Sequence, residues 1–485
     1  MPTVVFVLHA HLPWVLTAPD AADGALEARW VFEAAFESHL PLLAMLVRRH
    51  ARGRATPLTV SLSPSLTAMW SDPRFAPGMR QYLAAQRDLA DAGRTVDPSL
   101  GPALDALLAA RAQRLATLEA LPHGLAVAWA EALRDARGAR WSTLAAHPFA
   151  PAYAAHPWLI DAALELGLAE HAAHTRAGRP EGLWLPECGW APWLDPRLAR
   201  AGVTATVLEA NGVLGAAPPP REGLRRPVKT PGGLTVLPRD PITARLVWDR
   251  HDGYPGHPHY RDFYADLAQR VPPGRRGCFE DRAGAPLPSG LKLWAVGPRG
   301  APSRPRYEAS LGSLQVQRDA YDFAEKVRAM GETVGRDAVV VAAFDAELFG
   351  HWWAEGVDWL DHALDALEDL GQPVATASAL GDAARETVMP GPSSWGEGSF
   401  GARWLTGEAG AMTAEVWRLA AEVRRALDRG LEAPARDEMV AATVRLAASD
   451  WPFLLREGAA PHYARRRFAA QRDQVVALLS ALRRR

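Results

Sequence analysis

The segment WLPECGW at residues 184–190 decides the fold, together with a second segment of the same form, FDAELFGHWW at 344–353. In each, a carboxylate, Glu187 or Asp345, comes directly after a short apolar run that is typical of a buried strand. In parallel α/β folds, catalytic residues lie where strands end and the loops to the helices begin. The two segments therefore predict an α/β fold with two acids at the carboxyl ends of parallel strands.

Paired acids beside tryptophans suit glycoside chemistry. One carboxylate attacks or stabilises the anomeric carbon, while the other protonates the leaving oxygen. Indole rings offer flat apolar faces to sugars, and they raise the pKa of a nearby acid by excluding water. A helix-capping Glu and a core Trp would explain either segment alone. Two such segments, in a chain with 18 Trp, favour the glycoside interpretation.

Strand patterns alternate with helix patterns along most of the chain. Val4–Leu8 reads as a strand, and Pro57–Leu66 reads as a second strand with its exit loop. Ala25–His50 reads as a helix that Pro41 should kink or divide, and Ala411 to the end reads as helical. Alternating strands and helices predict a parallel sheet with crossover helices, most economically a barrel. Further strands are predicted at 140–147, 234–237, 291–296 and 373–376.

Histidines follow two of these strands. Strand alternation puts His9 and His11 on the same side of the first strand, and His147 ends another strand candidate. The first pair could contact a sugar or a catalytic carboxylate, fill a barrel end with polar groups, or bind a metal. His147 is either a cleft residue or a loop cap. For the first pair, a metal is the least favoured of the three, because no compact His/Cys/Asp cluster follows His11. We predict no metal and no cofactor, since the acid pair supplies the chemistry without one.

Composition limits the partners. The 485 residues carry 54 Lys+Arg against 55 Asp+Glu, a net charge of −1, so neither nucleic acid nor an anionic membrane is an expected partner. Two cysteines, Cys188 and Cys278, make no disulfide framework. The amino terminus lacks the features of a signal peptide, and no apolar run approaches the roughly 18 residues of a membrane span. We expect a cytoplasmic protein, with a monomer favoured.

Several segments resemble glycoside hydrolase family 57, and within it the 1,4-α-glucan branching enzymes. The resemblance covers nearly the whole chain, in HAHLPW at 9–14, WLPECGW at 184–190, WDRHDGYPG at 248–256, FDAELFGHWWAEG at 344–356, WGEGSF at 395–400 and SDWPF at 449–453. It implies an incomplete (β/α)7 barrel with a small helical insertion and an all-helical C-terminal domain. We place the barrel at 1–188 and 234–385, the insertion with a cleft loop at 189–233, and the C-terminal domain at 386–485.

The resemblance also implies residue roles. Glu187 matches the family nucleophile and Asp345 the general acid/base of a retaining mechanism, which predicts carboxyl groups about 5 to 5.5 Å apart. Trp294, Trp395, Trp404 and Asp450 match positions that line the glucan groove. The full set of predicted substrate-binding residues is His9, His11, Trp14, His147, Trp190, Trp248, Trp294, His351, Trp352, Trp395, Trp404, Asp450 and Trp451.

The expected substrate is an α-1,4-glucan, and the expected reaction is branching. The resembling enzymes carry a tyrosine in a loop that folds over the site and excludes water, whereas Gly215–Gly233 contains no tyrosine. An open site would favour water as the acceptor, so hydrolysis or 4-α-glucanotransfer is the alternative. Two other classes remain: a metal-dependent deacetylase-like hydrolase that uses His9 and His11, and a non-catalytic glucan-binding protein.

Overall fold

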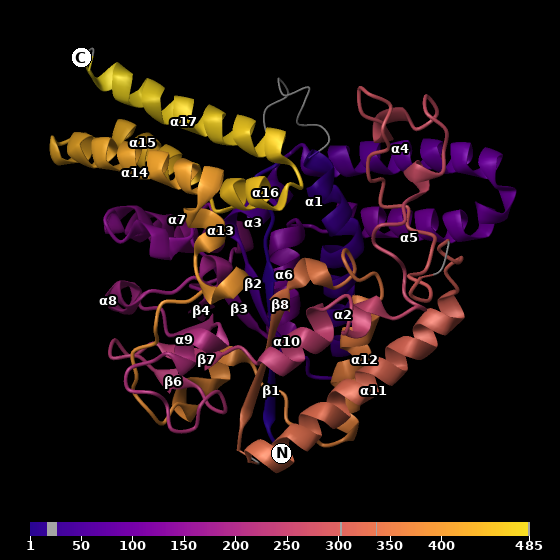
Figure 1. Cartoon of the computed structure of the whole chain (residues 1–485), viewed down its shortest axis with the longest axis horizontal. Coiled ribbons are helices and arrows are strands. Elements are labelled where there is room, and N and C mark those ends of the chain that lie inside the picture. The colour runs from indigo at the N-terminus through magenta and orange to yellow at the C-terminus, as the bar shows by residue number, and fades with distance from the viewer. Residues whose placement is uncertain (17–26, 301–302, 336, 484–485) are drawn as a thin grey trace.

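A curled parallel sheet forms the centre of the computed structural model, which describes residues 1–16, 27–300, 303–335 and 337–483 (Figure 1). Five strands run in the order β4-β3-β2-β1-β8. They are β1 (Thr3–Ala10), β2 (Thr59–Leu62), β3 (Ala139–Ser142), β4 (Gly182–Leu183) and β8 (Val339–Asp345). All four neighbouring pairs are parallel, as expected for strands joined through helices.

Two more parallel strands continue the curl. In a second sheet, β5 (Ala205–Leu208) pairs in parallel with β7 (Thr235–Pro238), which also pairs with the antiparallel β6 (Val228–Lys229). Just after β7, the Asp240 amide donates to the carbonyl of Val341 in β8. This contact joins the two sheets on one side. The arrangement confirms the incomplete (β/α)7 barrel.

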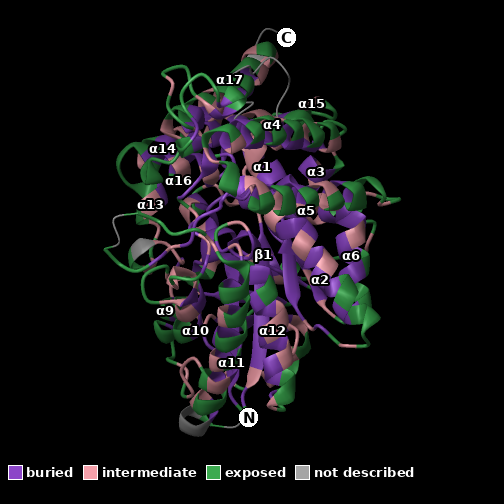
Figure 2. Ribbon diagram, turned by 90° about the vertical axis from the view of Figure 1, so that its right-hand side faces the viewer, coloured by how far each residue is buried: buried purple, intermediate pink, exposed green. Residues whose placement is uncertain are grey.

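Helices cover the outside of the barrel (Figure 2). Their apolar side chains pack on alternate residues of the central strand. In β1, Val4, Phe6 and Leu8 pack against helices, while Val5 and Val7 face a separate inner core. The helices up to residue 248 are α1 (Ala28–Ala34), α2 (Leu40–Ala51), α3 (Pro64–Ser71), α4 (Phe75–Val96), α5 (Gly101–Glu119), α6 (Leu125–Asp135), α7 (Pro157–Thr175), α8 (Asp195–Arg200), α9 (Ala210–Leu214) and α10 (Pro241–Trp248). They are followed by α11 (Ala309–Val334) and α12 (Gly356–Asp369).

A π-helical turn, Ala35–His39, links α1 to α2 without a break. Pro41 was predicted to kink or divide this helix, and the structure shows that it does not divide it. Pro41 stands in the first turn of α2, where the wider turn before it absorbs the missing N–H donor. The run Ala28–Ala51 has the length and apolar composition of a membrane span, but 72% of its most apolar window is buried in the protein's own core.

Three predicted segments differ from the structure. Residues 373–376 form no regular strand in the described chain, although the Val4 amide donates to Pro373 and that of Ala375 to Val4. Residues 291–296 make only isolated bridges. The loop Gly215–Gly233 reaches the amino end of β8, where the Arg225 carbonyl accepts from the Val339 amide. That contact lies six residues before Asp345, about 20 Å along the strand, so this part of the loop is no cleft wall.

The last helices lie together at one end of the barrel (Figure 1). They are α13 (Ala402–Leu405), α14 (Gly407–Asp428), α15 (Ala435–Leu446), α16 (Asp450–Glu457) and α17 (Pro461–Arg483). Bridges from Pro148 to Ala448 and from Trp190 to Ser393 join this C-terminal part to the barrel loops. We keep the three-part division as a proposal with one change: β5 belongs to the barrel, because it pairs with β7 across the predicted boundary at 233.

The loop after β8 packs tightly on the π turn, which makes Gly350 a test of the fold. Gly350 has φ +102°, and a Cβ there would overlap the carbonyl oxygen of Glu37. We expect Gly350→Ala to lower the free energy of unfolding by about 3 kcal/mol or more, since backbone strain and overpacking add. The measurement is denaturant unfolding followed by circular dichroism.

Gly53→Ala is the matched control. Gly53 also has a positive φ, +72°, but open space surrounds its Cβ position. The expected loss is about 1–2 kcal/mol, from the backbone conformation alone. Equal losses for the two variants would show that the contact between Gly350 and the π turn is not tight.

Candidate active site

Strand register places three polar side chains in one inward row at the carboxyl ends of the central strands. The inner-facing residues of β8 are Val339, Val341 and Ala343, so Asp345 continues that row. In β1 the inward row ends on His9, which is the register partner of both Asp345 and Ser61. Because strand residues alternate between faces, the sequence itself directs these groups into the barrel mouth.

Glu187 reaches the same place from a strained turn. It has φ 63°, and Cys188 after it has φ 48°, a left-handed conformation that non-glycine residues rarely adopt. The Trp395 indole N–H donates to Glu187 Oε2 at 2.9 Å, and the Ser449 hydroxyl donates to Oε1 at 2.9 Å. The Trp395 amide also donates to the Glu187 carbonyl at 3.0 Å. These bonds fix a side chain that is only 9% exposed.

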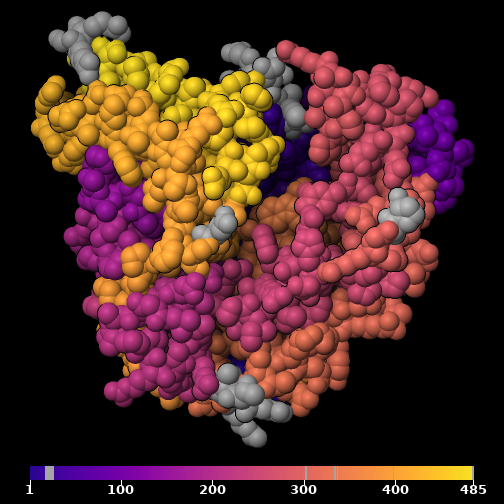
Figure 3. All heavy atoms as spheres, viewed as in Figure 1, coloured from indigo at the N-terminus to yellow at the C-terminus, as the bar shows by residue number. Residues whose placement is uncertain are grey.

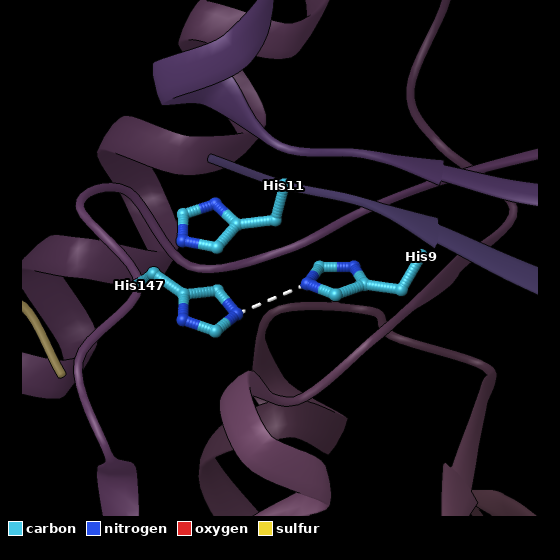
Figure 4. Close-up of side chains that lie close together, drawn as sticks. All are labelled: His9, His11 and His147. Atoms are coloured by element: carbon cyan, nitrogen blue, oxygen red, sulfur yellow. Dashed lines mark hydrogen bonds between the residues drawn. The ribbon is translucent and has the colours of Figure 1, made fainter. Parts of the chain in front are cut away.

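The three predicted histidines come together, with their rings directed toward one another (Figure 4). His9 Nε2 and His147 Nε2 are 3.0 Å apart, and His11 stacks on His147 with ring centroids at 3.8 Å. His11 Nε2 lies 3.0 Å from Asp450 Oδ1. His147 also has a left-handed backbone, φ 56°, and its carbonyl accepts from the Ser449 amide.

A metal could be imagined among these rings, because their nitrogens lie within 4.8 Å of one another. However, all six ring nitrogens already have polar partners in the protein. His9 and His147 bond to each other, His11 bonds to Asp450, and the three Nδ1 atoms bond to Ser61, Ser63 and Ser449. The cluster thus fits a hydrogen-bonded group better than a metal centre, and it gives the deacetylase-like alternative no support.

The two acids differ in their electrostatics. Burial raises the pKa of Asp345 well above its usual range, and the charges of Glu347 and Glu187 raise it further against the opposing effect of Arg239. Burial also raises the pKa of Glu187, but the hydrogen bonds from Trp395 and Ser449 work against that shift. Asp345 is therefore the natural proton donor of the pair.

The loop that carries Asp345 rests on the π turn. His39 Nε2 lies 2.7 Å from Glu347 Oε1, and both side chains are buried. The Ser38 hydroxyl donates to the Phe349 carbonyl at 2.6 Å, and His351 Nδ1 lies 2.9 Å from Glu37 Oε2. These contacts hold the loop that follows Asp345 against the π turn.

Glu33, Glu37 and His351 also form a group with metal-like spacing. Two cations already occupy it: Lys292 Nζ lies 3.4 Å from Glu37 Oε2, and Arg111 donates to Glu37 Oε1 at 2.6 Å. Burial opposes ionisation of Glu37, but Lys292, His351 and Arg111 together lower its pKa. The group is a buried ion network. Through its contact with Glu37, the predicted binding residue His351 helps to hold the loop that follows Asp345.

The predicted tryptophans fall into two sets. Trp248 and Trp352 are 44% and 39% exposed, and their rings meet edge to face at 5.6 Å. Trp14 and Trp395 are partly buried, and Trp395 touches Glu187. These four can offer a ring face or edge to a sugar.

The structure corrects the prediction for the other tryptophans, Trp190, Trp294, Trp404 and Trp451, which are at most 6% exposed. Trp190 donates to the Pro390 carbonyl, and Trp404 stacks on Phe149 with ring centroids at 4.5 Å. Trp294 lies between Arg270 and Arg306, and Trp451 donates to Gln471. Their rings are covered by protein, so they support the site without facing a sugar.

Sequence reasoning did not assign roles to Ser449, Glu347, Trp184 and His39. The first three lie inside the motifs that were singled out, so a search of those motifs for polar and aromatic neighbours could have found them. Trp184 stacks on His9 with ring centroids at 5.0 Å. His39 lies in an apolar helix pattern and gave no signal.

The surrounding surface is hollowed. Figure 3 shows a recess between the C-terminal helices, in yellow, and the segment near 250–300, in pink, with N-terminal residues in indigo at its floor. A recess of this kind suits a chain-like ligand better than a closed pocket would.

Comparison with known proteins gives a consistent result. A probable 1,4-alpha-glucan branching enzyme of Mycobacterium tuberculosis is 31% identical, in an alignment that covers 95% of this chain and 88% of the relative. The 1,4-alpha-glucan branching enzyme of Thermococcus kodakarensis is 26% identical over 96% of this chain and 71% of its own length. No family model matches the chain.

Two solved structures share the fold. An alpha-amylase of Thermotoga maritima superposes with a TM-score of 0.87 and 25% identity, over 99% of this chain and 93% of its own. A GH57-type branching enzyme of Pyrococcus horikoshii gives a TM-score of 0.82 and 23% identity, over 97% and 88%. The shared fold thus extends over nearly all of this chain and most of each solved structure.

The charge of Glu347 gives a pH prediction. In the role expected for Asp345, its acid form donates the proton, so we expect turnover to fall as the pH rises through its pKa. Glu347→Gln removes a negative charge that raises this pKa. The pKa of Asp345 should then fall, and the alkaline limb of the pH–rate profile should move to lower pH by about one unit.

Glu368→Gln serves as the control, because that carboxylate lies 59% exposed at the surface of α12. Its profile should match the wild type. An unmoved alkaline limb in Glu347→Gln would mean that Glu347 does not act on Asp345.

Proposed function

This chain belongs to the 1,4-alpha-glucan branching enzymes of glycoside hydrolase family 57, and from that membership we propose that it cleaves α-1,4 bonds of a glucan and transfers the released chain to a 6-hydroxyl. The observation that carries the proposal is the pair of acids at the barrel mouth. Asp345 has a strongly raised pKa, and Glu187 is held by two hydrogen-bond donors. A proton donor beside a fixed carboxylate is what glycosyl transfer requires.

In the proposed mechanism Glu187 attacks the anomeric carbon while Asp345 gives its proton to the departing oxygen. The product is a covalent glycosyl-enzyme. Asp345, now a carboxylate beside Arg239, next takes the proton of the incoming hydroxyl, and the configuration at the anomeric carbon is retained. The exposed Trp248 and Trp352 would carry the glucan chain beyond the cleavage point.

Hydrolysis is the second candidate, and two observations favour it. The loop Gly215–Gly233 has no tyrosine, and its Arg225 end lies at the amino end of β8, away from Asp345. The alpha-amylase of Thermotoga maritima also shares the fold with 25% identity. A site that admits water would release the glycosyl-enzyme as a free chain. We also propose the cytoplasm as the compartment, since both cysteines are free thiols.

The product of amylose separates the two reactions. Purified protein incubated with amylose should give a rising α-1,6 signal in the proton NMR spectrum, with few new reducing ends. New reducing ends without new α-1,6 linkages would assign hydrolysis instead. A mixture would give the ratio in which the glycosyl-enzyme partitions between a sugar hydroxyl and water.

Glu187→Gln should lower turnover at least about a thousandfold, because the amide cannot form the glycosyl ester. The fold should remain intact, since the amide keeps the shape of the carboxyl group, and circular dichroism checks this. Glu181→Gln, at an exposed position six residues earlier, is the matched control and should keep full activity. Retained turnover in Glu187→Gln would remove Glu187 from the nucleophile role.

A further inference from the structure

A chain of hydrogen bonds leads from Glu187 into the barrel. The Ser61 hydroxyl donates to the Ser142 carbonyl at 3.1 Å, and the same oxygen lies 3.2 Å from His9 Nδ1. His9 Nε2 lies 3.0 Å from His147 Nε2. The inner half of the chain is thus two serines and two imidazoles, all buried.

The outer half ends at the acid. His147 Nδ1 lies 3.0 Å from the Ser449 hydroxyl oxygen, which lies 2.9 Å from Glu187 Oε1. His147 Nδ1 is itself only 3.7 Å from that carboxyl oxygen. The whole chain therefore contains five successive contacts, and each needs one hydrogen.

The tautomers of His9 and His147 follow from counting hydrogens, starting at the Ser142 carbonyl. Ser61 donates its hydrogen to the Ser142 carbonyl, so His9 must donate to Ser61 from Nδ1. A neutral His9 then accepts at Nε2. His147 must donate from Nε2, and a neutral His147 accepts at Nδ1 from Ser449. Ser449 then has no second hydrogen to donate to an ionised Glu187. Four hydrogens are available for five contacts, so all five hydrogen bonds form only when a fifth hydrogen is present.

We propose that Glu187 shares one proton with the buried pair His9 and His147 through Ser449, so that the chain stores the nucleophile as a neutral acid and releases it as a carboxylate. The fifth hydrogen has two places that keep all five bonds. It sits on Glu187, which then donates to Ser449, or it makes His147 an imidazolium that donates to Ser449. This proposal rests on the role of Glu187 in the proposed function.

The transfer balances without any outside proton acceptor. The Glu187 O–H bond breaks as its proton passes to the Ser449 oxygen, and the Ser449 hydrogen passes to His147 Nδ1. A neutral acid and a neutral imidazole become a carboxylate and an imidazolium. When Glu187 is freed from the sugar, the two protons move back. No hydrogen bond is lost in either direction, so the proton transfer costs little free energy even though the groups are buried.

Other charged groups bias where the proton rests. His11, whose pKa Asp450 raises against burial, stacks on His147 and disfavours a second cation there. Burial lowers the pKa of His9 and His147 well below the usual range, and it raises that of Glu187. The remaining charged groups near Glu187 are Asp450 and the other acid, Asp345, which itself lies near Glu347 and Arg239. These groups favour Glu187 as the site of the proton while no substrate is bound, and in that state Glu187 donates to Ser449. When substrate binding moves the proton to His147, Ser449 donates to the Glu187 carboxylate, the direction described above for the ionised acid.

Histidine NMR tests the chain without relying on activity. In protein labelled with nitrogen-15 histidine, Glu187→Gln should show a neutral His9 protonated at Nδ1 and a neutral His147 protonated at Nε2, because the amide N–H replaces the acid proton. In the wild type, the His147 signals should shift with pH at the same midpoint as the acidic limb of kcat/KM. That shift should vanish in Glu187→Gln. Opposite tautomers, or a His147 titration that survives in Glu187→Gln, would overturn the proposal.

Two serine variants test the link itself. Ser449→Ala opens the chain, so the acidic limb of kcat/KM should move to higher pH by about one unit, and Ser449→Thr, which keeps the hydroxyl, should restore it. An unchanged limb in Ser449→Ala would refute the shared proton. If Glu187→Gln instead stays active, the nucleophile assignment fails, while the histidine titration still reports on the chain.

Discussion

The two hydrogen bonds that join Glu187 to Trp395 and Ser449 are the constraint on which the site depends. Glu187 has a left-handed backbone that costs free energy, and such a conformation persists only where its surroundings fix it. Here the backbone amide and the indole of Trp395 both bond to Glu187. His147 repeats the pattern, with Ser449 bonding to its backbone and its ring. Two strained turns of the barrel are thus held by one C-terminal segment.

Asp345 is supported in a different way. Its strand sets its direction by alternation, and the loop after it lies on the π turn through the contacts of His39 with Glu347 and of Ser38 with Phe349. Burial raises the pKa of Asp345, and the charge of Glu347, a residue of that loop, raises it further. Glu187, the proposed nucleophile, is therefore held by hydrogen bonds, whereas Asp345, the proposed proton donor, is buried beside a neighbouring negative charge. This difference in support separates the roles of two chemically similar groups.

The fold and the position of the acids could be predicted because they follow from short-range patterns. Apolar runs that end on Glu187 and Asp345 specify parallel strands, and the alternation in HAHLPW places His9 in the barrel mouth. Which tryptophans lie open could not be predicted. Trp352 and Trp404 look alike in sequence, yet only packing between distant elements covers Trp404 with Phe149.

The same limit applies to His39 and to Gly350. The first pairs with Glu347, 308 residues later, and the second approaches the carbonyl of Glu37. Local periodicity carries no information on such long-range contacts.

The long separation of Glu187 from its donors has a consequence for synthesis. Trp395 follows it by 208 residues and Ser449 by 262. Chains emerge from the ribosome at about 5–20 residues per second, so the barrel's central strands are complete well before the nucleophile has both donors. A nascent chain that already has both acids would thus reach its finished site geometry only after Ser449 has emerged.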